Sequence, residues 1–210
     1  MVEGKLYRSA SPVDNLLNRA PYVDRLIRQA GVQTVMNMAD TPERIEALFA
    51  TEDFDSPYYR ELYEAGKVFA RELFIDFDGD AFAKGIVKGF TFLADGETPY
   101  LVHCLEGKDR TGFAVMLLES LMGWDVQRIV DDYMQTYANY FGIEPGSEAY
   151  NMILEMNLEV MVRTEAGVAD DVPIEAIDLK AAAEAFLIDN GMAQEKLKLL
   201  EAKLTSDGVP

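Results

Sequence analysis

The sequence is poor in the residues that disulfides require, and it has one cysteine, Cys104, and one histidine, His103. A single thiol forms no internal disulfide, so the chain suits a reducing compartment. We therefore expect a cytoplasmic protein.

Long apolar runs and positive charge are also scarce. No stretch approaches about 18 consecutive apolar residues, so we expect neither a transmembrane helix nor stable insertion into a membrane. Residues 1–6 lack a basic flank followed by an apolar segment, so we expect no signal peptide. The formal net charge of −18 argues against nonspecific binding to nucleic acid or to anionic membranes. A local phosphate site stays compatible with this charge, because it can carry its own cationic residues.

Short apolar segments alternate with helical ones in the first half of the chain. β-Branched and apolar runs predict strands over Lys5–Arg8, Val32–Met38, Val68–Phe74 and Tyr100–His103. Segments of helical spacing lie between them, such as Tyr22–Ala30, which Gly31 ends. This alternation predicts an α/β fold with a mostly parallel sheet of about four to five strands, flanked by helices on both faces.

The second half of the chain is almost wholly helical in its pattern. The expected helices are Arg110–Met122, Asp125–Phe141, Ser147–Val162, Leu179–Asn190 and Ala193–Leu204. A chain of this length suits a single domain, 1–210. In this division residues 1–122 carry the sheet, the loop after its last strand and the following helix. Residues 123–210 form a helical part of the same domain.

The most informative stretch of the sequence is 101–112, where an apolar strand runs into His103 and Cys104. Five residues separate Cys104 from Arg110, and Thr111 then opens an apolar helical run. The cysteine supplies a nucleophile, the loop backbone supplies amide donors, and the arginine supplies a planar two-pronged clamp for phosphoryl oxygens. The helix adds the positive end of its dipole. This order predicts a site for a phosphate ester.

Individual residues of this stretch have different expected roles. The candidate phosphate-binding residues are Leu105, Glu106, Gly107, Lys108, Asp109 and Arg110. Gly107 lets the backbone turn tightly. Thr111 can donate its hydroxyl to the thiolate, and His103 is expected to orient the loop rather than transfer protons. Lys108 is either a solvated cation at the loop tip or a second contact for a polyphosphorylated substrate. A lone cysteine is commonly an inert core residue, but the surrounding pattern favours the nucleophile.

The pattern His-Cys-x5-Arg-Thr-Gly resembles the signature of the cysteine-dependent protein tyrosine phosphatase superfamily. Residues 107–112, Gly-Lys-Asp-Arg-Thr-Gly, resemble its bacterial branch, which includes lipid-directed and tyrosine-directed phosphatases. The segments Leu6–Ala10, Thr34–Met38 and Ala182–Leu187 are also similar to that branch.

The resemblance implies a two-step reaction without a metal or another cofactor. Cys104 attacks phosphorus and forms a cysteinyl phosphate, which water then hydrolyses. Arg110 and the loop amides meet the charge that develops on the phosphoryl oxygens. The implied substrates are phosphotyrosine and, with relaxed specificity, phosphoserine, phosphothreonine or phosphoinositides, carried by a phosphorylated protein or a small phosphoester. The sequence leaves the oligomeric state open.

The general acid has two candidate positions. The family usually supplies an aspartate from a loop before the cysteine motif, and Asp76, Asp78 and Asp80 follow the strand predicted at Val68–Phe74. Asp76 is favoured among these, because it lies nearest to the strand end. The other candidate for the general acid is Asp109 inside the loop. The resemblance implies this role, because the corresponding aspartate has been assigned as the acid in relatives with Gly-Lys-Asp-Arg. We favour Asp109 slightly over Asp76.

Other functions are compatible with a loop of this shape. They are an inositol-phosphate or phosphoinositide phosphatase, rhodanese-like sulfur transfer, arsenate reduction and non-catalytic binding of phosphoproteins. Arsenate reduction through a thiol cascade needs further cysteines, which this chain lacks. A non-catalytic relative would have lost Cys104 or Arg110, and both are present. Phosphatase activity is therefore the favoured reaction class.

Overall fold

The computed structural model describes residues 1–206, and within this range the strands form one four-stranded parallel sheet. The strands are β1 (Leu6–Ser9), β2 (Thr34–Asn37), β3 (Val68–Ala70) and β4 (Tyr100–His103), in the order β1-β4-β2-β3. The prediction of an α/β fold with a parallel sheet is confirmed.

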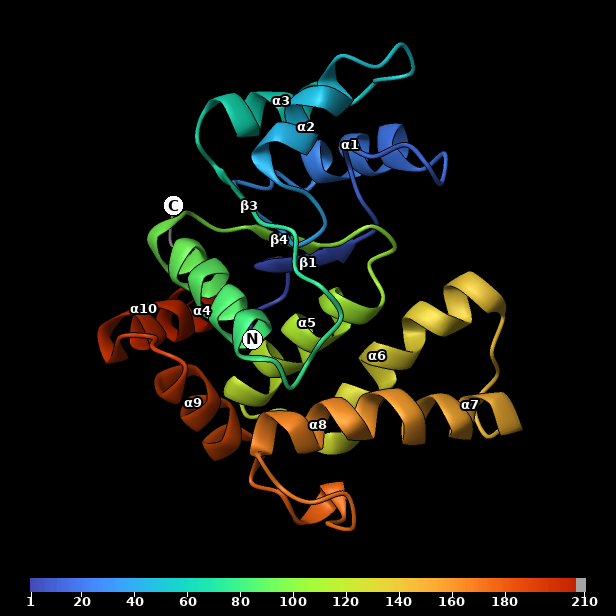
Figure 1. The fold of residues 1–210 in the computed structure, drawn as a ribbon, viewed down its shortest axis with the longest axis vertical. Helices are drawn as coiled ribbons and strands as arrows, with labels where there is room; N and C mark the ends of the chain where they lie inside the picture. The colour runs from blue at the N-terminus through green and yellow to red at the C-terminus, as the bar shows by residue number, and fades with distance from the viewer. Residues whose placement is uncertain (207–210) are drawn as a thin grey trace.

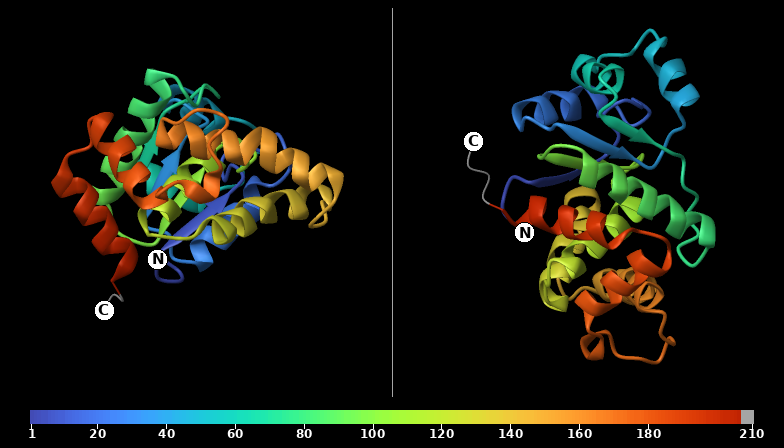
Figure 2. Two further views of the ribbon diagram at one scale, coloured as in Figure 1. Left: turned by 90° about the horizontal axis from the view of Figure 1, so that it is seen from below. Right: turned by 90° about the vertical axis from the view of Figure 1, so that its left-hand side faces the viewer.

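Helices cover both faces of this sheet (Figures 1 and 2). They are α1 (Ala20–Gln29), α2 (Pro42–Phe49), α3 (Pro57–Glu64), α4 (Asp80–Asp95), α5 (Asp109–Leu121), α6 (Val126–Phe141), α7 (Glu148–Ile153), α8 (Glu159–Ala166), α9 (Leu179–Asp189) and α10 (Gln194–Thr205). A π-helical turn, Leu154–Leu158, joins α7 to α8, and a short 3₁₀ turn spans Ile174–Ala176. Within residues 1–206 no helix has the length and apolar character to cross a bilayer.

Strand side chains alternate between two cores. Val35 and Leu101 pack with α1, α2 and α3 on one face, whereas Met36 and Val102 pack with α4 and α5 on the other. Successive side chains of a strand point to opposite faces, and a parallel sheet with helices on both sides buries both sets. This explains why the strands read as continuous apolar runs in the sequence.

Two elements differ from the sequence prediction. The strand expected over Val68–Phe74 ends at Ala70, opposite the end of β2 at Asn37. Beyond it, the N–H groups of Arg71 and Leu73 still donate to Asn37 O and Met38 O, but outside a regular ladder. The helix expected over Ser147–Val162 is interrupted by the π-helical turn and runs on to Ala166. Apolar spacing alone does not distinguish a π-helical turn from a continuous α-helix.

Helix α5 carries a buried carboxyl group, that of Glu119, which is 3 % exposed. Burial raises the pKa of Glu119 to about 9, and Asp132 adds to this rise, although Arg8 and Arg128 oppose it. The side chain is therefore protonated in the folded protein at neutral pH, whereas the unfolded chain ionises it. Folding then binds a proton, so this group lowers stability as the pH rises from about 4.5 to about 9.

We predict that Glu119→Gln stabilises the protein by about 3 kcal/mol at pH 7, because glutamine removes the protonation cost of about 1.4 kcal/mol per pH unit. The gain should vanish near pH 4.5, where the unfolded glutamate is itself protonated. Denaturant unfolding at several pH values measures this difference. Glu195→Gln, an exposed change of the same kind, serves as the control. An equal effect of Glu119→Gln at every pH would contradict the prediction.

Candidate active site

Cys104 lies directly after β4, at the edge of the sheet where the parallel strands end. Ligands of open α/β sheets bind at this edge. The thiol is free and buried, with the residue 3 % exposed. The chain then turns through residues 105–108 and enters α5 at Asp109. The stretch that the sequence singled out is therefore a strand, a loop and a helix N-terminus in succession.

Gly107 is required in this loop by its conformation and by its surroundings. Its φ is +73°, a left-handed conformation that other residues rarely adopt. A Cβ atom at this position would also collide with the backbone of Ser9 and Ala10. The loop thus packs tightly against the end of β1.

The carbonyl groups of the loop are held by neighbouring segments. Leu105 O accepts from the backbone N–H of Ser11 at 2.9 Å, and Glu106 O accepts from the Tyr140 hydroxyl. Gly107 O accepts from Arg8 Nη2 at 3.2 Å, and Arg8 Nη1 lies 2.7 Å from Asp132 Oδ2. In a planar trans peptide the following N–H points away from the carbonyl. The N–H groups of residues 106–108 therefore point away from these contacts.

We predict that Tyr140→Phe lowers kcat about tenfold with little change in KM, because Glu106 O loses its donor and the loop is less rigidly placed. A tenfold rate change corresponds to about 1.4 kcal/mol. Steady-state hydrolysis of phosphotyrosine, the substrate that the resemblance implies, measures the effect. Tyr22→Phe on α1, where the side chain is exposed, removes a hydroxyl away from the loop and should leave kcat unchanged. Equal activity of both variants would contradict the role of the Tyr140 contact.

Arg110 is oriented by two backbone carbonyls from the ends of neighbouring strand segments. Its Nη1 donates to Met38 O at 2.9 Å and to Leu73 O at 3.0 Å. Within the described residues, Nε is buried and has no hydrogen-bond partner. Nε and Nη2 form the fork of the guanidinium that binds two oxygens of one anion. Anchoring Nη1 in this way leaves that fork for a ligand.

His103 and Thr111 flank the loop at its two ends. The His103 ring is buried, with Nδ1 3.2 Å from Cys104 O and an edge-to-face contact to Tyr59. Burial lowers its pKa to about 4, so the ring is neutral at physiological pH. This geometry suits the predicted orienting role, which stays a prediction. Thr111 Oγ1 is buried, and no other group of the described chain bonds to it.

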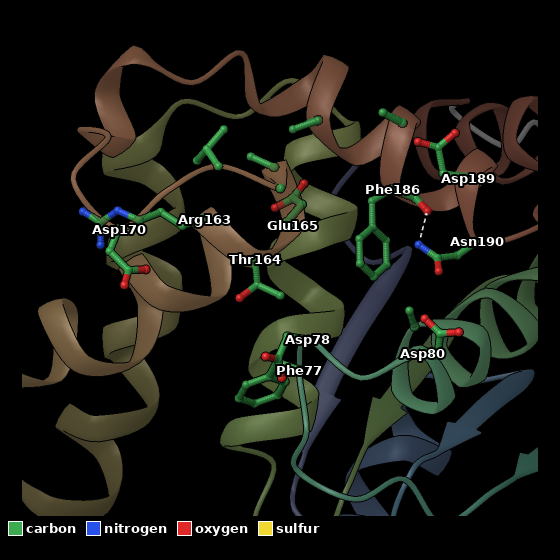
Figure 3. Close-up of a pocket in the computed structure, with 16 residues that line it drawn as sticks. Phe77, Asp78, Asp80, Arg163, Thr164, Glu165, Asp170, Phe186, Asp189 and Asn190 are labelled. Atoms are coloured by element: carbon green, nitrogen blue, oxygen red, sulfur yellow. Dashed lines mark hydrogen bonds between the residues drawn. The ribbon is translucent and has the colours of Figure 1, made fainter.

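The candidate acids occupy different places. Asp109 is the first residue of α5, with its carboxylate 3.7 Å from Lys108 Nζ. Asp76 is exposed in the loop after β3, and its carboxylate lies directly against Gly79. Asp78 and Asp80 line a separate cavity beside α8 and α9 (Figure 3). Asp109 thus directly follows the loop of Cys104 in the chain, whereas Asp78 and Asp80 line a cavity that Cys104 does not line.

The charge of Lys108 is paired inside the loop. Its Nζ lies 3.1 Å from Glu106 Oε2 as well as 3.7 Å from Asp109 Oδ2. Two carboxylates beside one ammonium leave this part of the loop with no surplus of positive charge.

Asp40, which was not predicted from the sequence, follows β2 and is 5 % exposed. Asn37 Nδ2 donates to Asp40 Oδ2 at 3.0 Å, and the same nitrogen donates to the Tyr59 hydroxyl. Burial raises the pKa of Asp40, and the hydrogen bond from Asn37 is the main opposing effect, with smaller contributions from the charges of Arg44 and Arg110. The sequence did contain a signal for Asp40, because it is a carboxyl residue that comes just after a buried strand. In a parallel sheet this position lies at the same edge as Cys104.

Comparison with known proteins shows that the chain is similar to a family of phosphatases. The model of a family described as "Tyrosine phosphatase family" matches residues 1–206. A segment of 46 residues is 50 % identical to "Triple specificity protein phosphatase PtpB" of Mycobacterium tuberculosis (strain ATCC 25618 / H37Rv). That segment covers 22 % of this chain and 16 % of the mycobacterial protein.

Proposed function

Because the chain belongs to the tyrosine phosphatase family, we propose that it hydrolyses phosphate monoesters, and phosphotyrosine above all, with Cys104 as the nucleophile. The observation that carries the proposal is the free fork of Arg110 beside the cysteine loop. One nitrogen is anchored on Met38 O and Leu73 O, and the buried Nε has no partner within residues 1–206. A buried donor without a partner is costly unless a ligand satisfies it.

The first step of the proposed reaction transfers the phosphoryl group to sulfur. The Cys104 thiolate attacks phosphorus in line, an S–P bond forms, and the bond from phosphorus to the ester oxygen breaks. The Arg110 fork and the loop N–H groups bind the phosphoryl oxygens, where they stabilise the charge of the transition state. Thr111, through its unpartnered hydroxyl, donates to the thiolate when sulfur is the leaving group.

The second step returns the enzyme to its starting state. Water attacks phosphorus, the S–P bond breaks, and phosphate leaves. A general acid protonates the ester oxygen in the first step and takes a proton from water in the second. We propose Asp109 for this role, since it is the first residue of α5 and stands between the loop and Arg110. Asp76 is the alternative, and Asp40 is a further carboxyl at this edge of the sheet.

We predict that Asp109→Asn lowers kcat about 100-fold and removes the basic limb of the pH–rate profile, because that limb reports loss of the acid's proton. Asp76→Asn and Asp40→Asn should keep the basic limb. Profiles of kcat/KM and kcat for the three variants make the comparison. Loss of the basic limb in Asp76→Asn or Asp40→Asn alone would transfer the acid role to that residue.

Phosphotyrosine is favoured as the substrate by the depth of the thiol and by the charge of the loop. Cys104 is 3 % exposed, so a long aryl ester reaches it more readily than the shorter ester of serine. Phe74 and Ile75 directly follow the Arg110 contact at Leu73, and they expose 76 % and 58 % of their surface. These apolar side chains suit an aromatic substrate. The local pairing of Lys108 disfavours highly anionic inositol phosphates.

Phosphate release from a panel of esters tests the proposal. The panel holds phosphotyrosine, phosphoserine and phosphothreonine peptides, an inositol phosphate and a phosphoinositide, because the name of the mycobacterial relative denotes more than one specificity. We expect the highest kcat/KM for phosphotyrosine. Absence of release from every ester would refute the phosphatase function, and a preference for the inositol phosphate would refute the substrate class.

A further inference from the structure

The π-helical turn Leu154–Leu158 lies between α7 and α8, and this helical stretch runs beside α6 (Figures 1 and 2). Turns of this kind are rare in proteins and often occur at functional sites. Within the turn Met156 is exposed, whereas Asn157 is partly buried. Asn157 Nδ2 donates to the Tyr137 hydroxyl of α6 at 3.1 Å. The turn is thus bonded to the helix that also holds the loop after β4, through Tyr140.

The polar contact continues along α6 to a second tyrosine. The hydroxyl oxygens of Tyr137 and Tyr133 lie 3.2 Å apart. The two residues are one helical turn apart and share a face of α6. Tyr133 is 2 % exposed and Tyr137 is 5 % exposed. Because Tyr137 accepts from Asn157, its own proton is left for the Tyr133 oxygen. The three side chains therefore form a buried chain in which each hydroxyl has a partner.

Tyr133 ends this chain against the first turn of α5. A Cβ atom at Gly112 would lie 2.6 Å from Tyr133 Cε2, so the ring packs directly on the backbone of that turn. The same turn begins with Asp109 and Arg110. Burial is the main cause of the raised pKa of Tyr133, and the charge of Asp109 adds to it. The tyrosine therefore lies close to Asp109 as well as to Gly112.

Tyr137 reaches the same carboxylate by a second route, through Lys108. The Lys108 ammonium lies 6.0 Å from the centroid of the Tyr137 ring, whose face attracts a cation. Its Nζ is also 3.7 Å from Asp109 Oδ2. A fixed Tyr137 ring thus helps to fix Lys108, and Lys108 helps to fix the carboxylate.

We propose that Asn157 is a positioning residue for the general acid Asp109, and that it acts through Tyr137 and Tyr133. This inference rests on the proposed function and adds to it a role for the π-helical turn. The amide of Asn157 fixes the Tyr137 hydroxyl, and the two tyrosines then hold the start of α5 and Lys108. The expected effect of losing Asn157 is therefore on protonation of the leaving group rather than on substrate binding.

Two substrates with different leaving groups test this role. The value of kcat/KM reports the steps up to the first phosphoryl transfer, in which the acid protonates the leaving oxygen. For Asn157→Ala we expect a fall of about fivefold in kcat/KM with a phosphotyrosine peptide, and an unchanged KM. With p-nitrophenyl phosphate, whose phenolate leaves readily without a general acid, the fall should stay below about twofold.

A second variant removes the other partner of the same bond. Tyr137→Phe deletes the hydroxyl but keeps the ring beside Lys108, and it should give the same dependence on the leaving group. The double variant Asn157→Ala/Tyr137→Phe should be no slower than the slower single variant, because both changes break one contact. Asn151→Ala on α7, where the side chain is exposed, is the matched control and should leave both substrates unchanged.

The outcomes separate this role from a general loosening of the fold. Wild-type kcat/KM in Asn157→Ala, or an equal loss with both substrates, would overturn the proposal. So would a further fivefold loss when Asn157→Ala is added to Asp109→Asn, because a residue that acts through Asp109 has no effect once the acid is gone. An unchanged Tm of each variant shows that the fold is intact. Hydrolysis of neither substrate by the wild type would instead refute the phosphatase function itself.

Discussion

The Cys104→Ser variant is expected to lose at least about 1,000-fold in kcat for phosphotyrosine, because a serine hydroxyl is a far weaker nucleophile than a thiolate. The neighbouring His103 directs its Nδ1 to Cys104 O, which is a backbone contact. Steady-state phosphate release measures the loss.

Binding of substrate should survive this change. The Arg110 fork and the loop N–H groups remain, so phosphotyrosine peptide should still bind to Cys104→Ser, and more tightly than the same peptide without phosphate. Calorimetry or fluorescence anisotropy gives the two Kd values, and an unchanged Tm shows that the loop is intact. Wild-type turnover in the serine variant would contradict a cysteine nucleophile.

The Arg110→Lys variant is the second change with a large expected effect, a loss of about 100- to 1,000-fold in kcat/KM. The guanidinium of Arg110 contacts Met38 O and Leu73 O with one nitrogen and keeps its fork free. A lysine ammonium is a single point of charge, so it cannot contact the two carbonyls and bind two phosphoryl oxygens at the same time. The positive charge is conserved, so the loss reports geometry rather than charge.

The matched control is Arg25→Lys, at an exposed position of α1, which should leave kcat/KM within about twofold. Thermal unfolding of both variants separates a catalytic effect from a loosened fold, because Arg110 also bonds to the segments that follow β2 and β3, at Met38 O and Leu73 O. If Arg110→Lys retained wild-type kcat/KM, the fork would not be the phosphate clamp.

Local features of the site could be read from the sequence. The strand, the tight turn at Gly107 and the helix that starts at Asp109 all follow from residues adjacent in the chain. The sheet could be anticipated as well, since its strands are apolar runs punctuated by glycine and proline. Backbone propensity and hydrophobic pattern act over short stretches, and here they agree with the fold.

The remaining features depend on contacts between distant segments. The anchors of Arg110 lie 72 and 37 residues before it, and the Tyr140 donor lies 34 residues after Glu106. No local sequence pattern encodes such pairings. The end of β3 at Ala70 is also set by a distant segment, because it lies opposite the end of β2.

Trapping of the cysteinyl phosphate tests the central claim most directly. The Asp109→Asn variant is mixed with p-nitrophenyl phosphate, whose phenolate leaves readily without a general acid, and the mixture is quenched rapidly. The first step then proceeds while the second, which lacks its base, is slowed. Mass spectrometry of the digested protein then locates any added phosphoryl group. The account predicts one phosphoryl group on Cys104 in Asp109→Asn and none when Cys104→Ser is added to that variant. Phosphate release without a phosphoryl group on Cys104 at any quench time, or a phosphoryl group on another residue, would contradict it.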